Sequence, residues 1–473
     1  MNPPPRRTTL TLILCLFISG PVLAQVKGPI REENVRAGLM FLASDAMQGR
    51  GSGTTYERIA AEYMGSQFRQ FRLEPGGDTD SSGNKSFVQR VALQSSKFTE
   101  APMLTVSSGS NVHKWQYGQD FLTSFLRSSR ISGELQVVEP SGEFTRGAVV
   151  AVKLPEGSNP QKRQEILRKG FTSGAAAVIV LESESNKRER EAGNARLPTL
   201  PPQRSGATNQ PFAVINLRKD ALDTLLALPS GAKVEFGGSA ENVDANATWN
   251  VIGVLRGSDP RAANEAIMIS AHLDHLGVNE TLQGDKIYNG ADDDASGCVA
   301  VLELARALSS GKRAKRTIYF VGFGSEERGG FGSQHFLANP PVPLTQIVAD
   351  LHFEMLGRPD PKVAAGKLWL TGYERSNLGP ELAKQGAPLV ADPHPEQSFF
   401  QRSDNYNLAL RGVIAQTVSS FGLHTDYHRP SDEVSKIDFL FMTQSLNSLV
   451  KPIQWLANSN FRPAWVPGQE PKR

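Results

Sequence analysis

The residues most able to do chemistry lie in the segment 269–297, which reads ISAHLDHLGVNETLQGDKIYNGADDDASG. It holds two histidines, His272 and His275, and three consecutive aspartates at 292–294. Burying three adjacent carboxylates is unfavourable unless positive charge lies among them, and a divalent metal ion is the usual source of that charge. Imidazole and carboxylate ligands together suit zinc and related ions. Seven of the eight histidines lie between His272 and His428, so we expect any metal chemistry in the C-terminal half.

The candidate ligands lie just beyond the ends of predicted strands or in the loop before a predicted helix. These candidates are His272, Asp293, Glu326, Glu327, Glu354 and His428. The carboxyl ends of parallel strands meet at one edge of a sheet, and ligands gather there. Five of these six side chains at one edge could hold two metal ions if one carboxylate bridges them.

The elements that must position these residues alternate between strands and helices. The predicted strands of this half are 250–255, 266–270, 317–323, 347–353 and 412–418, and the clearest helix is 296–308. Such alternation indicates a largely parallel sheet that is covered by helices on both faces. We therefore predict an α/β fold for the C-terminal half.

The N-terminal half has two different textures. Residues 34–73 show the apolar spacing of two helices, joined by the glycine-rich turn 49–53, which we interpret as a plain connector. Residues 102–238 contain short apolar runs typical of strands, and the proline-rich stretch 197–203 is predicted to be a loop. Because this second segment shows no set of catalytic side chains, we interpret it as an inserted accessory domain.

Five motifs together resemble the secreted co-catalytic zinc aminopeptidases and their glutamate carboxypeptidase relatives. The motifs are AHLDHLG, NGADDDASG, GSEERGGFGS, HFEMLGR and LHTDYHRPSD. The resemblance covers roughly residues 248–461, and 34–93 resemble the N-terminal helices of the same family. It implies a three-layer αβα zinc-peptidase core with a mainly parallel sheet. The stretches ISGELQVVE and GAAAVIV resemble a β-rich protease-associated domain inserted into that core.

The expected organisation has five parts. They are a signal peptide (1–24), the N-terminal helical part of the peptidase domain (25–96), a protease-associated-like domain (97–240), the zinc metallopeptidase catalytic domain (241–461) and a C-terminal tail (462–473).

Carried over motif by motif, the resemblance implies two Zn²⁺ ions per chain. His272 and Glu354 would bind one ion, Glu327 and His428 would bind the other, and Asp293 would bridge both. The family usually has aspartate where Glu354 stands, so the additional methylene changes the geometry of the first site.

The resemblance also implies roles around the metals. Asp274 would fix the imidazole of His272. Glu326 would act as general base, taking the proton of a water that bridges the two metals. Tyr427 would stabilise the oxyanion of the tetrahedral intermediate. A cis peptide bond is expected directly after the bridging aspartate.

The other histidines are expected to play lesser parts. His275 is interpreted as a neighbour of the ligands or a surface residue, and His424 is a weaker candidate than His428. Structural roles are expected for His335, His352 and His394. Asp404 is a candidate for lining the substrate pocket, and Asp292 and Asp294 for capping the following helix.

The whole chain sets further limits. It has 473 residues, and 51 basic against 48 acidic side chains, a balance that argues against a nucleic-acid partner. Residues 1–24 have the basic start, short apolar run and small-residue cleavage site of a signal peptide, so export to the periplasm or medium is expected. No later stretch is long and apolar enough to span a membrane. Cys298 is expected in the core.

We expect an exported zinc-dependent exopeptidase acting on peptides, most simply an aminopeptidase. A carboxypeptidase or dipeptidase on the same scaffold remains an alternative, because the sequence does not show which chain end is bound. An amine would need an acidic side chain such as Glu354 or Glu326, and a carboxylate would need Arg402 or Arg358. A single-metal glutaminyl cyclase and a catalytically inactive binding protein are further alternatives. The oligomeric state is left open.

Overall fold

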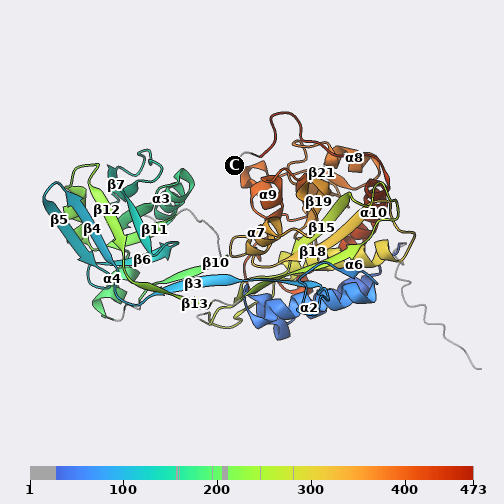
Figure 1. Cartoon of the computed structure of the whole chain (residues 1–473), viewed down its shortest axis with the longest axis horizontal. Coiled ribbons are helices and arrows are strands. Elements are labelled where there is room, and N and C mark those ends of the chain that lie inside the picture. Colours follow the sequence, from blue (N-terminus) through green and yellow to red (C-terminus); the bar gives the residue numbers. More distant parts are fainter. Residues whose placement is uncertain are drawn as a thin grey trace, which may run out of the picture.

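The structure is a computed structural model, and it describes residues 28–155, 158, 160–193, 195, 197–204, 211–244, 247–280 and 282–471. The expected signal peptide, 1–24, lies outside the described residues. The chain forms a larger and a smaller body, joined by a narrow three-stranded sheet (Figure 1). That sheet has the order β10-β3-β13, with β10 at Thr199–Arg204, β3 at Leu93–Phe98 and β13 at Ala240–Asp244.

The larger body is built on a nine-stranded sheet of order β1-β14-β18-β15-β19-β22-β20-β21, in which β2 also pairs with β14. Its strands are β1 (Glu74–Pro75), β2 (Val88–Val91), β14 (Thr248–Leu255), β15 (Ala266–His272), β18 (Thr317–Phe323), β19 (Ile347–Phe353), β20 (Leu368–Leu370), β21 (Leu389–Ala391) and β22 (Ala415–Ser419). Strands β18, β15, β19 and β22 run parallel, whereas β14 and β20 are antiparallel to their neighbours β18 and β22. The predicted α/β fold with a mainly parallel sheet is confirmed.

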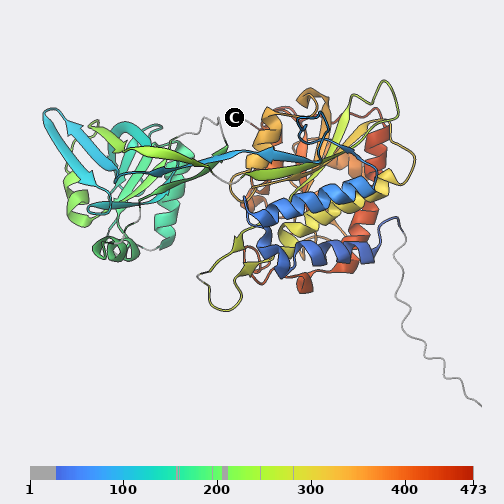
Figure 2. The same ribbon diagram turned by 60° about the horizontal axis from the view of Figure 1, so that its bottom comes forward.

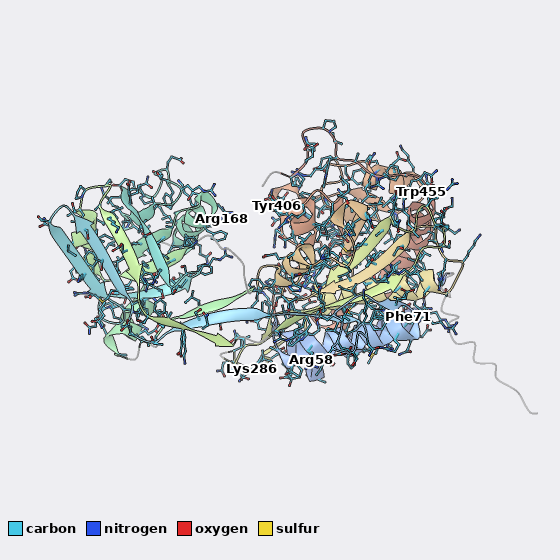
Figure 3. All side chains as sticks on the ribbon, in the orientation of Figure 1. Arg58, Phe71, Arg168, Lys286, Tyr406 and Trp455 are labelled. Carbon is cyan, nitrogen blue, oxygen red and sulfur yellow. The ribbon has the colours of Figure 1, made fainter. Side chains whose placement is uncertain are left out.

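Helices cover both faces of this sheet. The helices on one face are α1 (Glu32–Leu42), α2 (Thr55–Gln70), α6 (Gly297–Ser309), α8 (Leu378–Lys384) and α10 (Phe439–Asn458), and those on the other are α7 (Phe331–Ala338) and α9 (Asp404–Ala409). Figure 2 shows α1, α2 and α6 lying across the first face. Arg58 of α2 and Tyr406 of α9 accordingly lie on opposite sides of the sheet (Figure 3).

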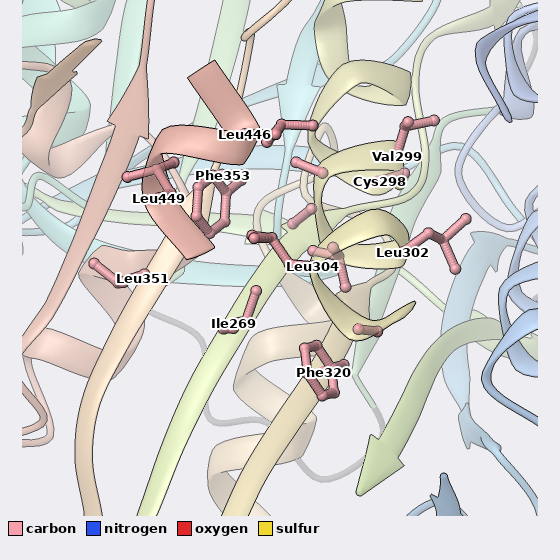
Figure 4. Close-up of a cluster of buried hydrophobic side chains, with 14 of the residues drawn as sticks. Ile269, Cys298, Val299, Leu302, Leu304, Phe320, Leu351, Phe353, Leu446 and Leu449 are labelled. Carbon is pink, nitrogen blue, oxygen red and sulfur yellow. The ribbon is translucent and has the colours of Figure 1, made fainter. Parts of the chain in front are cut away.

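Alternation along the strands divides the core between the two faces. In β15, Ile267 and Ile269 pack against the α6 side, whereas Met268 packs against the α7 side. Figure 4 shows Ile269 together with Leu304 of α6 and Leu446 of α10 in the first of these layers. Cys298 is fully buried in the same layer, which confirms its expected place in the core.

Two apolar side chains of the helices α1 and α2 are exposed. Met40 is 59% exposed and Ile59 is 39% exposed. The inward stripe of α1 is made by Val35, Leu39 and Leu42, and Met40 lies outside it.

The smaller body has its own eight-stranded sheet, of order β5-β4-β12-β7-β8-β9-β11-β6. Its strands are β4 (Met103–Ser108), β5 (Asn111–Gln116), β6 (Phe121–Leu126), β7 (Arg130–Val138), β8 (Val149–Val152), β9 (Ala177–Leu181), β11 (Ala213–Leu217) and β12 (Lys233–Gly237). Its helices are α3 (Pro160–Ser173), α4 (Glu184–Glu191) and α5 (Lys219–Leu226). Two clusters of buried apolar residues between Phe98 and Phe236 form a core separate from that of the larger body.

The predicted loop at 197–203 is wrong. Most of this stretch is strand β10, which pairs antiparallel with β3 and shifts register between Leu200 and Gln203. Prolines lack a backbone N–H and are tolerated in a strand at a sheet edge or at an irregularity, and β10 provides both.

The helices in the described part of the chain include none that is both long enough and apolar enough to cross a lipid bilayer.

Candidate metal centre

The candidate ligands lie where four neighbouring strands end, except Asp293, which lies in the turn Ala291–Ser296 before α6. Strand β15 extends two residues further than predicted and ends at His272 itself. Glu354 follows the last residue of β19 directly, and Glu326 and Glu327 lie three and four residues beyond β18. His428 comes from the loop beyond β22. Parallel strands carry these loops to the same edge of the sheet, and the structure brings the side chains together there.

His272, Asp293 and Glu354 form the first ligand group. One nitrogen or oxygen atom of each lies within 4.8 Å of the others. The Nε2 atom of His272 is 3.2 Å from Oδ1 of Asp293.

The second group forms around the other oxygen of Asp293. The Nε2 atom of His428 lies 3.2 Å from Oδ2 of Asp293 and 3.2 Å from Oε2 of Glu327. Asp293 therefore presents one carboxylate oxygen to each group, which is the arrangement that a bridging ligand needs.

His275 also belongs to this second group. Its Nδ1 atom lies 2.8 Å from Oε1 of Glu327, and its side chain is buried. One atom each of His275, Asp293 and Glu327 lies within 4.8 Å of the others. The interpretation of His275 as a surface residue is wrong, and its place beside the ligands is the alternative that agrees with the structure.

The donor set fits divalent metal ions. At its centre, two buried side-chain atoms have no hydrogen-bond partner, namely Nε2 of His272 and Oδ2 of Asp293. Buried polar atoms are nearly always paired, so two unpaired atoms within the ligand groups suit the binding of a cation. Imidazole and carboxylate are ligands that zinc accepts.

The charges at the site influence one another strongly. Burial opposes the ionisation of Asp293, but hydrogen bonds to His272 and His428 outweigh it and hold the pKa of this carboxyl well below its usual value. Burial likewise opposes protonation of His428, but Asp293 and Glu327 raise its pKa to about 10. Burial raises the pKa of Glu326 well above the usual value.

The flanking aspartates hold the loop. The peptide bond between Asp293 and Asp294 is cis, as predicted. Asp294 accepts hydrogen bonds from the N–H groups of Gly297 at 2.9 Å, Met355 at 3.2 Å and His272 at 3.2 Å. These contacts tie three of the loops that carry ligands to one carboxylate.

Asp274 also organises loops. The Nδ1 atom of His272 is 3.2 Å from the backbone carbonyl of Asp274 and 3.8 Å from its carboxylate. That carboxylate accepts the N–H groups of Glu326 at 2.9 Å and Glu327 at 3.3 Å, together with the hydroxyl of Ser52. It thus links β15, the loop after β18 and the N-terminal turn.

The turn 49–53, expected to be a plain connector, is part of the scaffold of the site. Arg50 is completely buried and donates to four backbone carbonyls, those of Leu42, Leu273, Asn289 and Gly290, at 2.6–3.1 Å. The carbonyl of Leu273 lies directly after His272, and that of Gly290 lies directly before the loop that holds the three aspartates. The sequence carried one signal, an arginine between two glycines, but nothing in its spacing indicated four partners.

Tyr427 lies beside the second ligand group. Its ring stacks on the ring of His428 with centroids 3.9 Å apart, and Nη2 of Arg402 lies 3.3 Å from its hydroxyl. A pocket extends from here and from Glu354 over the aromatic side chains Trp369, Phe399 and Phe421.

The two arginines considered for binding a substrate carboxylate differ in their surroundings. Arg358 pairs with Asp426 at 2.7 Å and Asp432 at 3.1 Å, and lies 3.7 Å from Asp292. Arg402 lines the pocket and is exposed. His424 contacts Asp292 at 2.9 Å and belongs to neither ligand group.

Known proteins resemble this chain in sequence. Leucine aminopeptidase 2 of Trichophyton rubrum is 29% identical over 381 residues, 70% of this chain and 70% of that protein. An aminopeptidase of Pseudomonas aeruginosa is 33% identical over 114 residues, 24% of this chain. The match spans only 19% of the length of the Pseudomonas protein.

Solved structures share the fold. An aminopeptidase from Aneurinibacillus sp. strain AM-1 aligns with 94% of this chain and 98% of its own, at 19% identity and a TM-score of 0.52. BSAP, a zinc aminopeptidase from Bacillus subtilis, aligns with 91% of this chain and 96% of its own, at 18% identity and a TM-score of 0.50. Residues 250–447, which carry every ligand of the two groups, match peptidase family M28.

Proposed function

We propose that this chain is an exported zinc-dependent exopeptidase, and that it acts as an aminopeptidase on peptides. The observation that carries the proposal is the carboxylate of Asp293, whose Oδ1 faces His272 and whose Oδ2 faces His428. Such a carboxylate suits two zinc ions, the first bound also by His272 and Glu354 and the second also by Glu327 and His428. The names of the relatives and their shared fold support the same class of activity.

Zinc ions held in this way lower the pKa of a water molecule and polarise a peptide carbonyl. The chain's own residues supply the other parts of the reaction. Glu326 belongs to neither ligand group, and in the proposal its carboxylate takes the proton of the attacking water and passes it to the leaving amine. The hydroxyl of Tyr427 donates to the oxyanion as the carbonyl is attacked.

The charge around the pocket supports binding of an amine. The carboxylate of Glu354 lines the pocket, that of Glu326 interacts electrostatically with Glu354, and Arg358 is already paired with acidic side chains. A peptide amino group would therefore find acidic partners. The alternative, a carboxypeptidase or dipeptidase, depends on Arg402, whose guanidinium faces the pocket.

The smaller body is proposed to be a protease-associated domain. The two bodies have separate apolar cores, and all the proposed ligands lie in the larger one. We propose that the smaller body affects access of peptides and takes no part in the chemistry.

A panel of peptides tests the proposed activity. The peptides have free or acetylated amino ends and free or amidated carboxyl ends, and the products are read by mass spectrometry before and after chelation. We expect loss of single residues from free amino ends, abolished by the chelator and restored by zinc. Cleavage of amino-blocked peptides with a free carboxyl end would instead favour the carboxypeptidase.

A further inference from the structure

Four polar side chains form a buried chain of hydrogen bonds that leads to Glu354. We infer that Ser403 and His352 are positioning residues, which hold the Glu354 carboxylate in place for the first metal and are themselves anchored by Ser270 and Asp350. This inference rests on the proposed metal centre, but not on the reaction carried out there.

The chain can be followed atom by atom. Oδ1 of Asp350 and Oγ of Ser270 lie 2.8 Å apart, and Oγ of Ser270 lies 2.9 Å from Nδ1 of His352. On the far side of the ring, Nε2 of His352 lies 3.0 Å from Oγ of Ser403. The same nitrogen lies 3.9 Å from Oε2 of Glu354, and the nearby Ser403 hydroxyl lowers the pKa of that carboxyl against the larger opposing effect of burial.

The strand pattern explains why these residues meet. Asp350, His352 and Glu354 alternate along β19 and its end, so their side chains point to one face of the sheet. Ser270 is the direct partner of His352 on the neighbouring strand β15. The residues between them, Leu351 and Phe353, pack into the apolar layer on the opposite face.

The face of the sheet that carries these hydrogen-bonded side chains is buried, where apolar side chains would have a lower desolvation cost. Asp350, His352 and Ser270 are fully buried, and Ser403 is 9% exposed. Burying polar groups is unfavourable unless they are paired, and hydrogen bonds that join such groups in a chain hold them in one arrangement. An arrangement of this kind can hold the three rotatable bonds of a glutamate side chain in a single geometry.

Ser403 provides an independent observation. It precedes α9 at the N-cap position, where a serine usually accepts a backbone N–H of the helix. Here its side chain makes no such capping bond and contacts His352 and Glu354 instead. The hydroxyl therefore serves the ligand, and its loss removes no helix cap.

The protons can be placed in one consistent direction. If Ser403 donates to Glu354, then Nε2–H of His352 donates to Ser403, and the Ser270 hydroxyl donates to Nδ1. Asp350 must then donate to Ser270. Burial raises the pKa of Asp350 to about 8, so its carboxyl carries the required proton at neutral pH.

Zinc affinity tests the inference without any need for catalysis. The full chain, as wild type and as Ser403→Ala, Ser403→Thr and Ser445→Ala, is titrated with zinc against a fluorescent chelator. We expect Ser403→Ala to weaken one of the two zinc sites at least tenfold, within the range found when a partner of a metal ligand is removed, and to leave the other unchanged. Ser403→Thr, which keeps the hydroxyl, should restore the affinity. Ser445→Ala removes a buried hydroxyl of α10 and should change neither site.

A second comparison tests the route through Glu354. In a Glu354→Asp background the shorter side chain no longer reaches Ser403 in the same way, so Ser403→Ala should have little additional effect. An equal loss of zinc affinity on Ser403→Ala in both backgrounds would overturn the inference. Unchanged zinc affinity at both sites of Ser403→Ala would also overturn it, and so would a Ser403→Thr chain that binds zinc as weakly as Ser403→Ala. A wild type that binds two zinc ions but cleaves no peptide would overturn the proposed function alone. A wild type that binds no zinc would overturn both.

Discussion

Glu326 and Glu327 follow the same strand, yet their carboxyl groups have different surroundings. Glu327 lies between His275 and His428, at 2.8 Å and 3.2 Å, which suits a metal ligand. Glu326 belongs to neither ligand group. Substituting a metal ligand should remove the metal, whereas substituting a general base should slow turnover and leave the metal bound. Substitutions can therefore separate the two roles.

Glu326→Gln is expected to keep both metals and to lower kcat by about 10²–10⁴-fold, the usual contribution of a general base. Asp293→Ala is expected to lose the metals, since both groups share that carboxylate. Zinc content after gel filtration and peptide turnover measure the two effects separately. Equal loss of zinc in the two variants would contradict the division of roles.

Asp350 predicts a dependence of stability on pH. Burial raises its folded-state pKa to about 8, whereas an unfolded aspartate has a pKa of about 3.9. The folded state therefore binds this proton more tightly, and its contribution to stability is lost as the pH rises from about 4 to about 8. Asparagine does not titrate, so Asp350→Asn should gain stability over the wild type with rising pH, by at most about 1.4 kcal/mol per pH unit.

Urea unfolding at pH 5 and pH 7.5 measures this difference in the free energy of unfolding. A difference between Asp350→Asn and wild type that is the same at both pH values would contradict a carboxyl that stays protonated in the folded protein.

At the scale of elements, the turn between α1 and α2 joins two loops of the site. Gly49 has a φ of +65°, and a Cβ there would lie 2.5 Å from the carbonyl oxygens of Gly277 and Tyr288. Those residues begin and end the small hairpin of β16 (Gly277–Val278) and β17 (Ile287–Tyr288), between the two halves of the metal-binding segment. A substitution at Gly49 must therefore displace backbone next to the ligands.

Gly49→Ala is expected to reduce both the free energy of unfolding and zinc affinity. Gly109→Ala is the matched control, because Gly109 also has a positive φ, +59°, but a Cβ there would meet nothing within 4 Å. The free energy of unfolding of the control should fall by only about 1–2 kcal/mol, the cost of a left-handed backbone at a residue with a Cβ, and its zinc affinity should not change. If chemical denaturation and zinc titration gave the same losses for both variants, the close contact at Gly49 would have no importance.

At the scale of the whole molecule, the two bodies share little beyond the narrow sheet between them. Val91 and Thr248 are direct partners across the antiparallel pair of β2 and β14, so the smaller body leaves and re-enters the larger one at adjacent positions. The larger body keeps its own core on both sides of that junction. We therefore expect the larger body to fold without the smaller one.

A shortened chain tests this expectation, with residues 93–246 replaced by a four-residue glycine-rich turn. It should fold cooperatively and bind zinc with wild-type stoichiometry, while its preference among long and short peptides changes. Circular dichroism, zinc titration and peptide turnover provide the readouts. A shortened chain that fails to fold would show that the smaller body and the connecting sheet support the larger core.

Much of the site could be predicted from the sequence, because the rules involved are local. Apolar runs identified β15, β18, β19 and β22, and polar side chains directly after such runs gather at one sheet edge in any parallel sheet. The proline-rich stretch 197–203 was predicted wrongly as a loop, because proline content does not show whether a neighbouring strand offers an edge for pairing. Here β3 offers that edge to β10.

By itself, the sequence determined the α/β class, the order of the strand ends and the types of side chain that arrive at them. Only the tertiary structure decided which oxygen of Asp293 faces which partner and that Arg50 holds both ligand loops. It also decided that the Ser403 side chain turns towards Glu354 and does not cap its own helix. The physical reason is that periodicity records which face a residue occupies, whereas a hydrogen bond depends on the position and direction of a partner that lies up to 240 residues away.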